Sequence, residues 1–426
     1  MSEFAAFVGL DWSDKKHDVC LVEAATGRKE FSIIKHNPQA LNDWALQLRS
    51  RFVGQKIAVC LEQSRGPLLF ALLKYDFLVL YPIHPKTLAS YREAFSPSRA
   101  KDDPSDAEYQ VELVVKHRDR LKAWRADDEQ TRTLQYLVEH RRRLINDRTR
   151  LSNRLTAALK SYFPQVLDWF PDIRTRLVCE FLQRWPELAA VKRARPSTLE
   201  QFFRAHHSTR KQTNRQRLAA IAESVPLVTD RAVITAAKLL AQALAAQMLA
   251  TLSAIREFDR AIEKLCAEHQ DFHLFSALPG AGTVYAARLL SAFGSDRERL
   301  ASADEVACWA GVSPVIERSG QSSWTRWRYF CPKFLRQSFV EYAGESIVHC
   351  GWAKVYYQQQ RDKGKSHQAA LRALAFKWIR IMWKCWQART PYDDATYLAA
   401  LRKQGSPLWA KLSGDLVTAA APAAVS

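Results

Sequence analysis

The sequence is short of acidic side chains for its size. Across 426 residues, 44 Asp and Glu stand against 63 Lys and Arg, which gives a formal net charge of +19 and a pI near 9.7. So large a surplus repels itself unless a polyanion neutralises it, and nucleic acid is therefore the first partner to expect. Hydrophobic residues still make up 47% of the chain, which excludes a disordered basic protein. We expect a folded chain of roughly two to four domains.

Membrane and export signals are also missing from the sequence. We find no run of about 18 uncharged apolar residues, the length that a membrane-spanning helix needs. Residues 1–11 lack the basic and then apolar layout of a signal peptide. We therefore predict an intracellular, cytoplasmic protein without a membrane partner.

Paired cysteines are absent. The 8 cysteines stand alone, with no CxxC pair and no Cys/His set at the spacing of zinc ligands. Free cysteine behaves as a small hydrophobic residue, so we expect reduced and mostly buried thiols.

The first hundred residues predict an α/β unit. Short apolar runs at 7–10, 18–22 and 30–34, separated by turn residues, indicate three strands. A helix is expected from Pro38, and buried strands at 56–61 and 77–81 flank a second helix at 67–73. The order βββαβαβ is that of the ribonuclease H fold, and we assign residues 1–125 to this domain.

From about residue 106 onward the pattern becomes helical. Mostly apolar residues recur at steps of three and four between Leu134 and Leu159, and again between Ile234 and Leu265, where alanine, methionine and phenylalanine join leucine and isoleucine. The second run exceeds four heptads, which indicates a coiled-coil seam or one partner of a long antiparallel hairpin. We assign 126–270 to a basic helical or coiled-coil region with an insertion near 164–230.

Positive charge is concentrated in this middle region. Residues 111–220 hold 24 Lys and Arg against 12 Asp and Glu, a surplus of 12 out of the total 19. A solvated helical face explains any single arginine run, but a surplus of this size favours contact with phosphate backbones. The candidate nucleic-acid contacts are Arg141, Arg142, Arg143 and Arg148.

The last third of the chain predicts a helical domain at 271–392 and an extension at 393–426. Its segment LPGAG at 278–282 precedes a helical pattern and matches a helix-hairpin-helix turn. There, Gly280 and Gly282 would let backbone N–H groups approach a phosphate. Trp378, Trp383 and Trp386 are expected in the core, and the tail beyond about Ser406 is expected to be mobile.

Four carboxylates fall at positions where they could meet. Asp11 ends the first predicted strand and Glu62 ends the fourth, which would be its neighbour in the sheet. Asp103 and Asp106 lie three residues apart at a helix start and so share one face; Asp102 beside them leaves a one-residue ambiguity. Such oxygen ligands suit Mg²⁺, and two ions could clamp a phosphodiester. Taken singly, the aspartates could equally be helix-capping or turn residues.

Five segments resemble one known family. They are FVGLDWSDKKHDVCLV, AVCLEQSRGP and KDDPSDA in the first part, and ALPGAGTVYAARLLSAFG and ACWAGVSPVIERSG in the last. The first three resemble the DEDD motifs of the insertion-sequence transposases of the one-ten group, whose relatives include Piv-type DNA invertases. The last two resemble that family's carboxy-terminal transposase domain.

The resemblance implies a site-specific recombinase with two catalytic parts. An RuvC-like domain would hold Mg²⁺ through Asp11, Glu62, Asp103 and Asp106, and a serine in the second domain would attack DNA. Ser319, in a short loop before Gly320, matches that serine, with Ser322 and Ser323 as rivals. The resemblance also implies donor and target DNA, a structured bridge RNA that chooses them, and a prokaryotic and nucleoid-associated setting. The heptad seam, and the need to cut two strands on each of two duplexes, argue for a homodimer that pairs into a tetramer.

Two other functions remain open at this stage. One is an RuvC-like nuclease or junction resolvase that uses the same four acids and no serine step. The other is a non-catalytic basic scaffold whose acids are structural.

Overall fold

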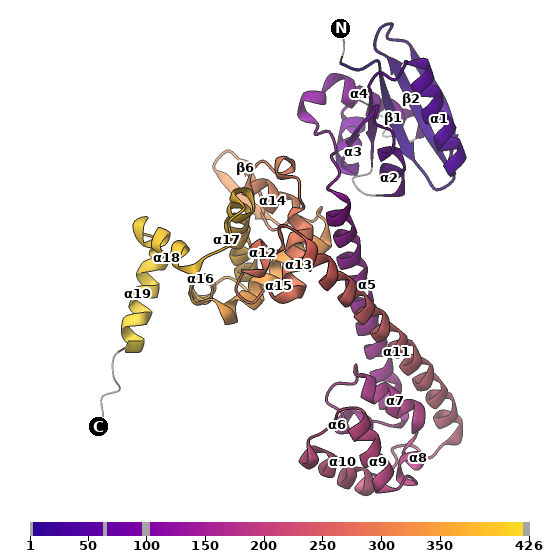
Figure 1. Ribbon diagram of the computed structural model, residues 1–426, viewed down its shortest axis with the longest axis vertical. Coiled ribbons are helices and arrows are strands. Elements are labelled where there is room, and N and C mark those ends of the chain that lie inside the picture. Colours follow the sequence, from indigo (N-terminus) through magenta and orange to yellow (C-terminus); the bar gives the residue numbers. More distant parts are fainter. Residues whose placement is uncertain (1–2, 63–65, 96–102, 421–426) are drawn as a thin grey trace. The chain divides into compact units, whose positions relative to one another are not determined.

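A computed structural model describes residues 3–62, 66–95 and 103–420, and the chain divides into two compact units (Figure 1). The first unit, Met1–Ala126, holds the larger sheet, and the second, Asp127–Ser426, is almost wholly helical.

The first unit is built on a five-stranded mixed sheet. Its strands are β1 (Ala6–Trp12), β2 (Lys16–Glu23), β3 (Lys29–Lys35), β4 (Ile57–Leu61) and β5 (Leu78–Pro82). They lie in the order β3-β2-β1-β4-β5. β1, β2 and β3 pair antiparallel, whereas β1 pairs parallel to β4 and β4 parallel to β5. The predicted element order βββαβαβ is confirmed.

Helices cover both faces of this sheet. The helices are α1 (Pro38–Arg51), α2 (Pro67–Leu73), α3 (Pro85–Phe95) and α4 (Asp103–Lys116). Ala6, Val8 and Leu10 share a core with α1 and α2, whereas Phe7 shares a core with α3 and α4. Because side chains alternate along a strand, the odd-numbered residues of β1 face α4.

Two long helices run through the second unit, α5 (Glu129–Tyr162) and α11 (Arg231–Glu268). The start of α5 shares a core with the end of α11, and the end of α5 shares one with the first half of α11. They are therefore an antiparallel pair, which settles the orientation that the sequence left open. The apolar seam from which we expected a dimer packs within one chain, so it no longer argues for one.

The segment between the long helices forms a small helical bundle beside the end of α5 and the start of α11 (Figure 1). It comprises α6 (Gln165–Trp169), α7 (Arg176–Arg184), α8 (Leu188–Lys192), α9 (Pro196–Ala205) and α10 (Lys211–Glu223). Phe163, Phe181 and Phe203 are fully buried there, beside Leu155 of α5 and Met248 of α11. The core of the α6–α10 segment is therefore continuous with the long helices.

The remaining helices pack around buried tryptophans. They are α12 (Phe272–Ser276), α13 (Gly282–Phe293), α14 (Ala303–Trp309), α15 (Lys333–His349), α16 (Gly351–Asp362), α17 (His367–Ala388), α18 (Asp394–Lys403) and α19 (Pro407–Ala420). Trp378 and Trp386 are fully buried as predicted, and Trp383 is half-buried. A hairpin of β6 (Val315–Ser319) and β7 (Ser322–Arg326) follows α14.

Two expectations need correction here. The segment beyond Ser406 was expected to be mobile, but 407–420 forms α19, anchored by the buried Leu408; residues 421–426 lie outside the described part. The prediction that no apolar stretch is long enough to span a membrane is wrong for α11. By length and composition alone, this helix could cross a membrane. Core helices of soluble proteins share these properties, and α11 packs against α5, α7 and α13.

The cysteine prediction is confirmed. All 8 cysteines are free, and Cys20, Cys60, Cys179, Cys266 and Cys350 are buried.

Candidate functional site: an acidic strand edge, a serine hairpin and an arginine pocket

Asp11 and Glu62 continue two paired parallel strands. Leu10 of β1 stands opposite Leu61 of β4, so the next residue on each strand is a carboxylate. Asp11 lies two residues after Gly9, and therefore on the same face of β1, which α4 covers. Glu62 lies two residues after Cys60, which faces α4 together with Ala58. Both side chains are half-buried. The sheet thus places the two acids at one edge and on one face.

Gly9 allows α4 to lie directly on β1. A Cβ atom at this position would be 1.9 Å from the carbonyl oxygen of Ala107 and 2.8 Å from the backbone nitrogen of Val111. Beside this contact, the backbone N–H of Leu10 donates a 2.8 Å hydrogen bond to Oε1 of the buried Gln110. Gly9 and Gln110 therefore set the distance between α4 and the strand that carries Asp11.

Asp103 and Asp106 occupy the first turn of α4, as predicted from their spacing. Asp103 is half-buried, and Asp106 is only 1% exposed. The Asp106 carboxylate forms an ion pair with the guanidinium of Arg92 on α3. Arg92 therefore supplies a cation to the acid nearest the Gly9 contact, a partner that the sequence did not predict because it lies on another helix.

Asp11 and Glu62 lie at one edge and on one face of the sheet, and Asp103 and Asp106 lie in the first turn of the helix that packs on that face. Within residues 3–62, 66–95 and 103–420, no three His, Cys, Asp or Glu side chains lie close enough to hold a metal ion. The rival Asp102 falls outside the described residues. The donor set is chemically suited to Mg²⁺ because carboxylate oxygens are its preferred ligands.

Ser319 lies in the second unit, at the tip of the β6–β7 hairpin. It is the last residue of β6 and pairs with Ser322 across the two-residue turn Gly320–Gln321. Gly320 has φ +57°, a left-handed conformation that suits glycine in such turns. Ser319, Ser322 and Ser323 are all exposed, so exposure does not separate the candidates.

An aromatic anchor follows this hairpin. The ring of Trp327, directly after β7, lies between the guanidinium groups of Arg336 and Arg372, at 4.4 Å and 4.0 Å from its centroid. These two cation–π contacts connect the base of the hairpin to α15 and α17.

The predicted helix-hairpin-helix glycines differ in their surroundings. Both have positive φ, +73° at Gly280 and +49° at Gly282. A Cβ on Gly280 would strike the ring of His349 at 2.4 Å, whereas Gly282 has open space around it. Gly280 therefore serves packing against α15, and Gly282 at the start of α13 is the more accessible of the two.

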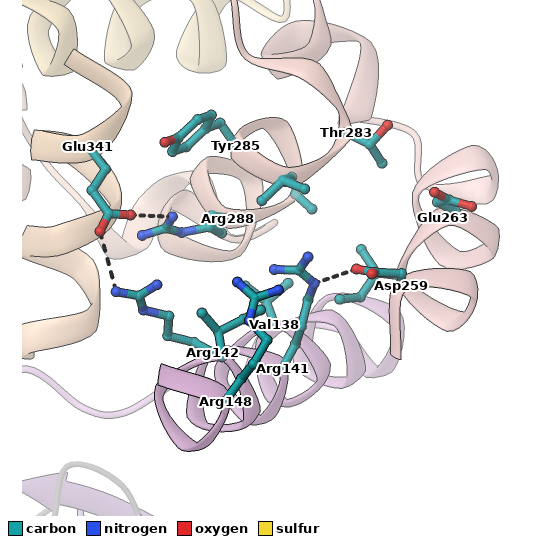
Figure 2. A pocket seen from close by; sticks show the side chains of 14 residues that line it. Val138, Arg141, Arg142, Arg148, Asp259, Glu263, Thr283, Tyr285, Arg288 and Glu341 are labelled. Carbon is teal, nitrogen blue, oxygen red and sulfur yellow. Dashed lines mark hydrogen bonds and ion pairs between the residues drawn. The ribbon is translucent and has the colours of Figure 1, made fainter. Parts of the chain in front are cut away.

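The four predicted arginines of α5 do not share one exposed face. Arg143 is exposed and pairs with Glu139 at 2.8 Å. Arg141, Arg142 and Arg148 are half-buried and line a pocket that is joined by Arg288 of α13 (Figure 2). Arg141, Arg142 and Arg148 therefore do not lie on a fully exposed face of α5. Arg288 was not predicted, because it stands within an apolar helical run.

Two family models match this chain, and both describe transposases. A family model described as a transposase matches residues 8–164, and a second, described as the transposase IS116/IS110/IS902 family, matches residues 272–358. Together these two regions include all the candidate acids and Ser319.

Similar relatives extend over most of the chain. The mini-circle putative transposase for IS117 of Streptomyces coelicolor is 26% identical over 93% of this chain and 97% of its own length. The insertion element IS900 uncharacterized 42 kDa protein of Mycobacterium paratuberculosis is 28% identical over 80% of this chain and 85% of its own. The IS116 44.8 kDa protein of Streptomyces clavuligerus is 26% identical over 88% and 93%. Over most of its length the chain is therefore similar to insertion-sequence transposases of the IS116/IS110/IS902 group.

Proposed function

We propose that this transposase cuts and rejoins DNA with Mg²⁺ held by Asp11, Glu62, Asp103 and Asp106, and with Ser319 as the nucleophile. The observation that carries the proposal is the shared edge of β1 and β4, where Asp11 and Glu62 follow paired residues and face the helix that begins with Asp103 and Asp106. The strand order β3-β2-β1-β4-β5 and the element order support an RuvC-like, ribonuclease H type of domain.

The four acids and Arg92 would have different electrostatic roles. Bound Mg²⁺ would supply Lewis-acid stabilisation of charge on the phosphodiester oxygens. Asp11 and Glu62 would hold the ion from the sheet, and Asp103 and Asp106 from the first turn of α4. Arg92 pairs with Asp106, and its positive charge compensates that buried carboxylate. Gly9 and Gln110 would act as positioning residues, because they set the distance between the helix and the strand.

Ser319 would exchange one phosphoester for another. Its Oγ forms a bond to phosphorus as the bond from phosphorus to one sugar oxygen breaks; the serine gives up its proton and the sugar oxygen gains one. A sugar hydroxyl of a second strand can then reverse the exchange and rejoin the DNA without an external energy source. The exposed position of Ser319 at a hairpin tip supports access to a strand of DNA.

Nucleic acids are the proposed partners. Donor and target DNA would be held together with a structured bridge RNA whose base pairing selects the sequence, since phosphate contacts supply affinity without sequence information. The surplus of 12 positive charges in residues 111–220 supports such contacts. Two strands must be cut on each of two duplexes, so we propose a homodimer that pairs into a tetramer.

Cleavage of labelled donor DNA tests the role of the acids. With Mg²⁺ and the RNA from the flanking sequence, Asp11→Asn is expected to lower strand cleavage on the order of 100-fold, because it removes a metal-binding oxygen charge. Asp14→Asn is the matched control, since Asp14 is exposed in the turn after β1 and loses the same charge. Mn²⁺ binding measured by calorimetry should weaken only in Asp11→Asn. Equal cleavage by the two variants would refute the metal site.

A further inference from the structure

A pocket in the second unit lies where α5, α11, α13 and α15 meet. Its volume is about 430 Å³, in the range of pockets that hold small organic ligands. Figure 2 shows side chains of Arg141, Arg142 and Arg148 directed from α5 toward the same space as Arg288. The pocket lies within one compact unit and is distinct from the acidic edge and the serine hairpin.

Arg288 is the feature that points to an absent ligand. Its side chain is only 8% exposed, with Nη1 bound to Glu341 at 2.7 Å and Nε to the Ser338 hydroxyl at 3.1 Å. Nη2 is buried and has no hydrogen-bond partner, and the same holds for Nε of Arg148. Burial lowers the pKa of both guanidinium groups. Buried donors of charged groups are normally satisfied, so these two nitrogens call for an acceptor inside the pocket.

The charges in the pocket favour one negative charge on that acceptor. Asp259 pairs with Arg141, and Glu341 is shared between Arg142, at 3.4 Å, and Arg288. With Glu263, three carboxylates stand against four arginines, which leaves one formal positive charge. A phosphodiester carries one negative charge, whereas a terminal phosphate carries nearly two.

The remaining walls suit the organic part of a nucleotide. Thr283, Val284 and Tyr285 come from the first turn of α13 and form one wall of the pocket. Val138, Ile145, Ile262 and Val284 add apolar surface, and Tyr285 offers an aromatic ring. Aromatic and apolar walls beside arginines are the usual composition of sites for unpaired bases.

We propose that this pocket binds one unpaired nucleotide of a nucleic-acid strand, with its phosphodiester against Arg148 and Arg288 and its base against the wall formed by Val284 and Tyr285. The inference rests on the proposed function in that the strand belongs to the DNA or the guide RNA that this transposase handles. It goes further because it assigns a nucleotide-binding site to a pocket whose lining includes none of the proposed catalytic residues.

Binding of short labelled single strands tests the proposal. Fluorescence anisotropy with oligothymidylate and oligouridylate, in EDTA so that nothing is cleaved, is measured across a salt series. Arg148→Gln is expected to weaken binding about tenfold and to reduce the salt slope by about one, the effect of one lost phosphate contact. Arg260→Gln is the matched control: the same charge is lost from the neighbouring helix α11, at an exposed position that does not line the pocket. Equal weakening by the two variants would overturn the proposal.

A second variant and a crosslink guard against an indirect effect. Thr283→Glu adds a negative charge at the exposed start of α13, where an acid favours the helix, so thermal stability should hold while strand binding weakens. Photocrosslinking of a 5-iodouracil strand should map to Tyr285 or its neighbours. Crosslinks confined to other elements would contradict the pocket, whereas tighter binding of one of the two probes would identify the strand as RNA or DNA. Because metal is absent, failure here leaves Asp11-dependent cleavage as a separate result.

Discussion

Single buried residues set the geometry of the acidic edge. Gly9 and Gln110 fix α4 against β1, and His17 lies at the other side of the same strand end, opposite Trp12 in the sheet register. His17 is fully buried, and its Nε2 lies 2.9 Å from Nδ1 of His36. The end of β1 that carries Asp11 therefore depends on a histidine that must remain neutral.

His17 makes the first unit sensitive to mild acid. Burial, and then the nearby His36, lower the pKa of His17 from 6.5 to about 4, partly opposed by Asp18. The unfolded chain takes up this proton at higher pH than the folded chain. The stabilising effect is therefore complete above pH 6.5 and is lost as the pH falls toward 4, by on the order of 3 kcal/mol at most.

Hydrogen exchange of β1 and β2 peptides across this pH range measures the effect. The parent should lose protection as the pH falls, and His17→Gln, which keeps a polar partner for His36, should show a flatter dependence. The same pH dependence in both proteins would contradict the assignment to His17.

At the scale of elements, α11 has two unlike sides. Leu244 is 1% exposed and packs in the core shared with α5 and α7, whereas Leu239 on the same helix is 61% exposed. Leu244→Ala should lower the free energy of unfolding by about 2–5 kcal/mol, because it leaves a cavity. Leu239→Ala should change it by less than about 0.5 kcal/mol. Urea denaturation of the two variants measures the difference.

The contrast between Leu244 and Leu239 also tests how α11 is used. If α11 packed against a membrane or a second subunit through its exposed side, Leu239→Ala would destabilise the protein as well. Equal costs for the two substitutions would therefore contradict the exposure of Leu239 and indicate that this side of α11 is covered.

Local sequence patterns predicted the helices and strands themselves better than they predicted which elements pack against one another. The apolar periodicity of α5 predicted a long helix, but it did not predict that Arg141, Arg142 and Arg148 are half-buried, because α13 and α15 are remote in sequence. For the same reason, Arg288 and the Arg92–Asp106 pair escaped the sequence analysis. The parallel pairing of β1 with β4, which aligns Asp11 and Glu62, did follow from the order of strands and helices.

At the scale of the whole molecule, the proposed chemistry is divided between two units. The acids lie in Met1–Ala126 and Ser319 lies in Asp127–Ser426, and family matches include both regions. A single reaction therefore requires residues from both units, whether from one subunit or from two. The family resemblance predicted this division, while the sequence analysis assigned no role to the folded α6–α10 segment.

A covalent link between Ser319 and DNA is the most direct test of this account. Protein, Mg²⁺, the flanking RNA and labelled donor DNA are incubated and denatured, and the surviving adduct is mapped by peptide mass spectrometry. We predict an adduct on Ser319 that is lost in both Ser319→Ala and Asp11→Asn and kept in Ser322→Ala and Ser323→Ala. Cleavage without an adduct, equally efficient in Ser319→Ala, would contradict the account and indicate a metal-dependent nuclease.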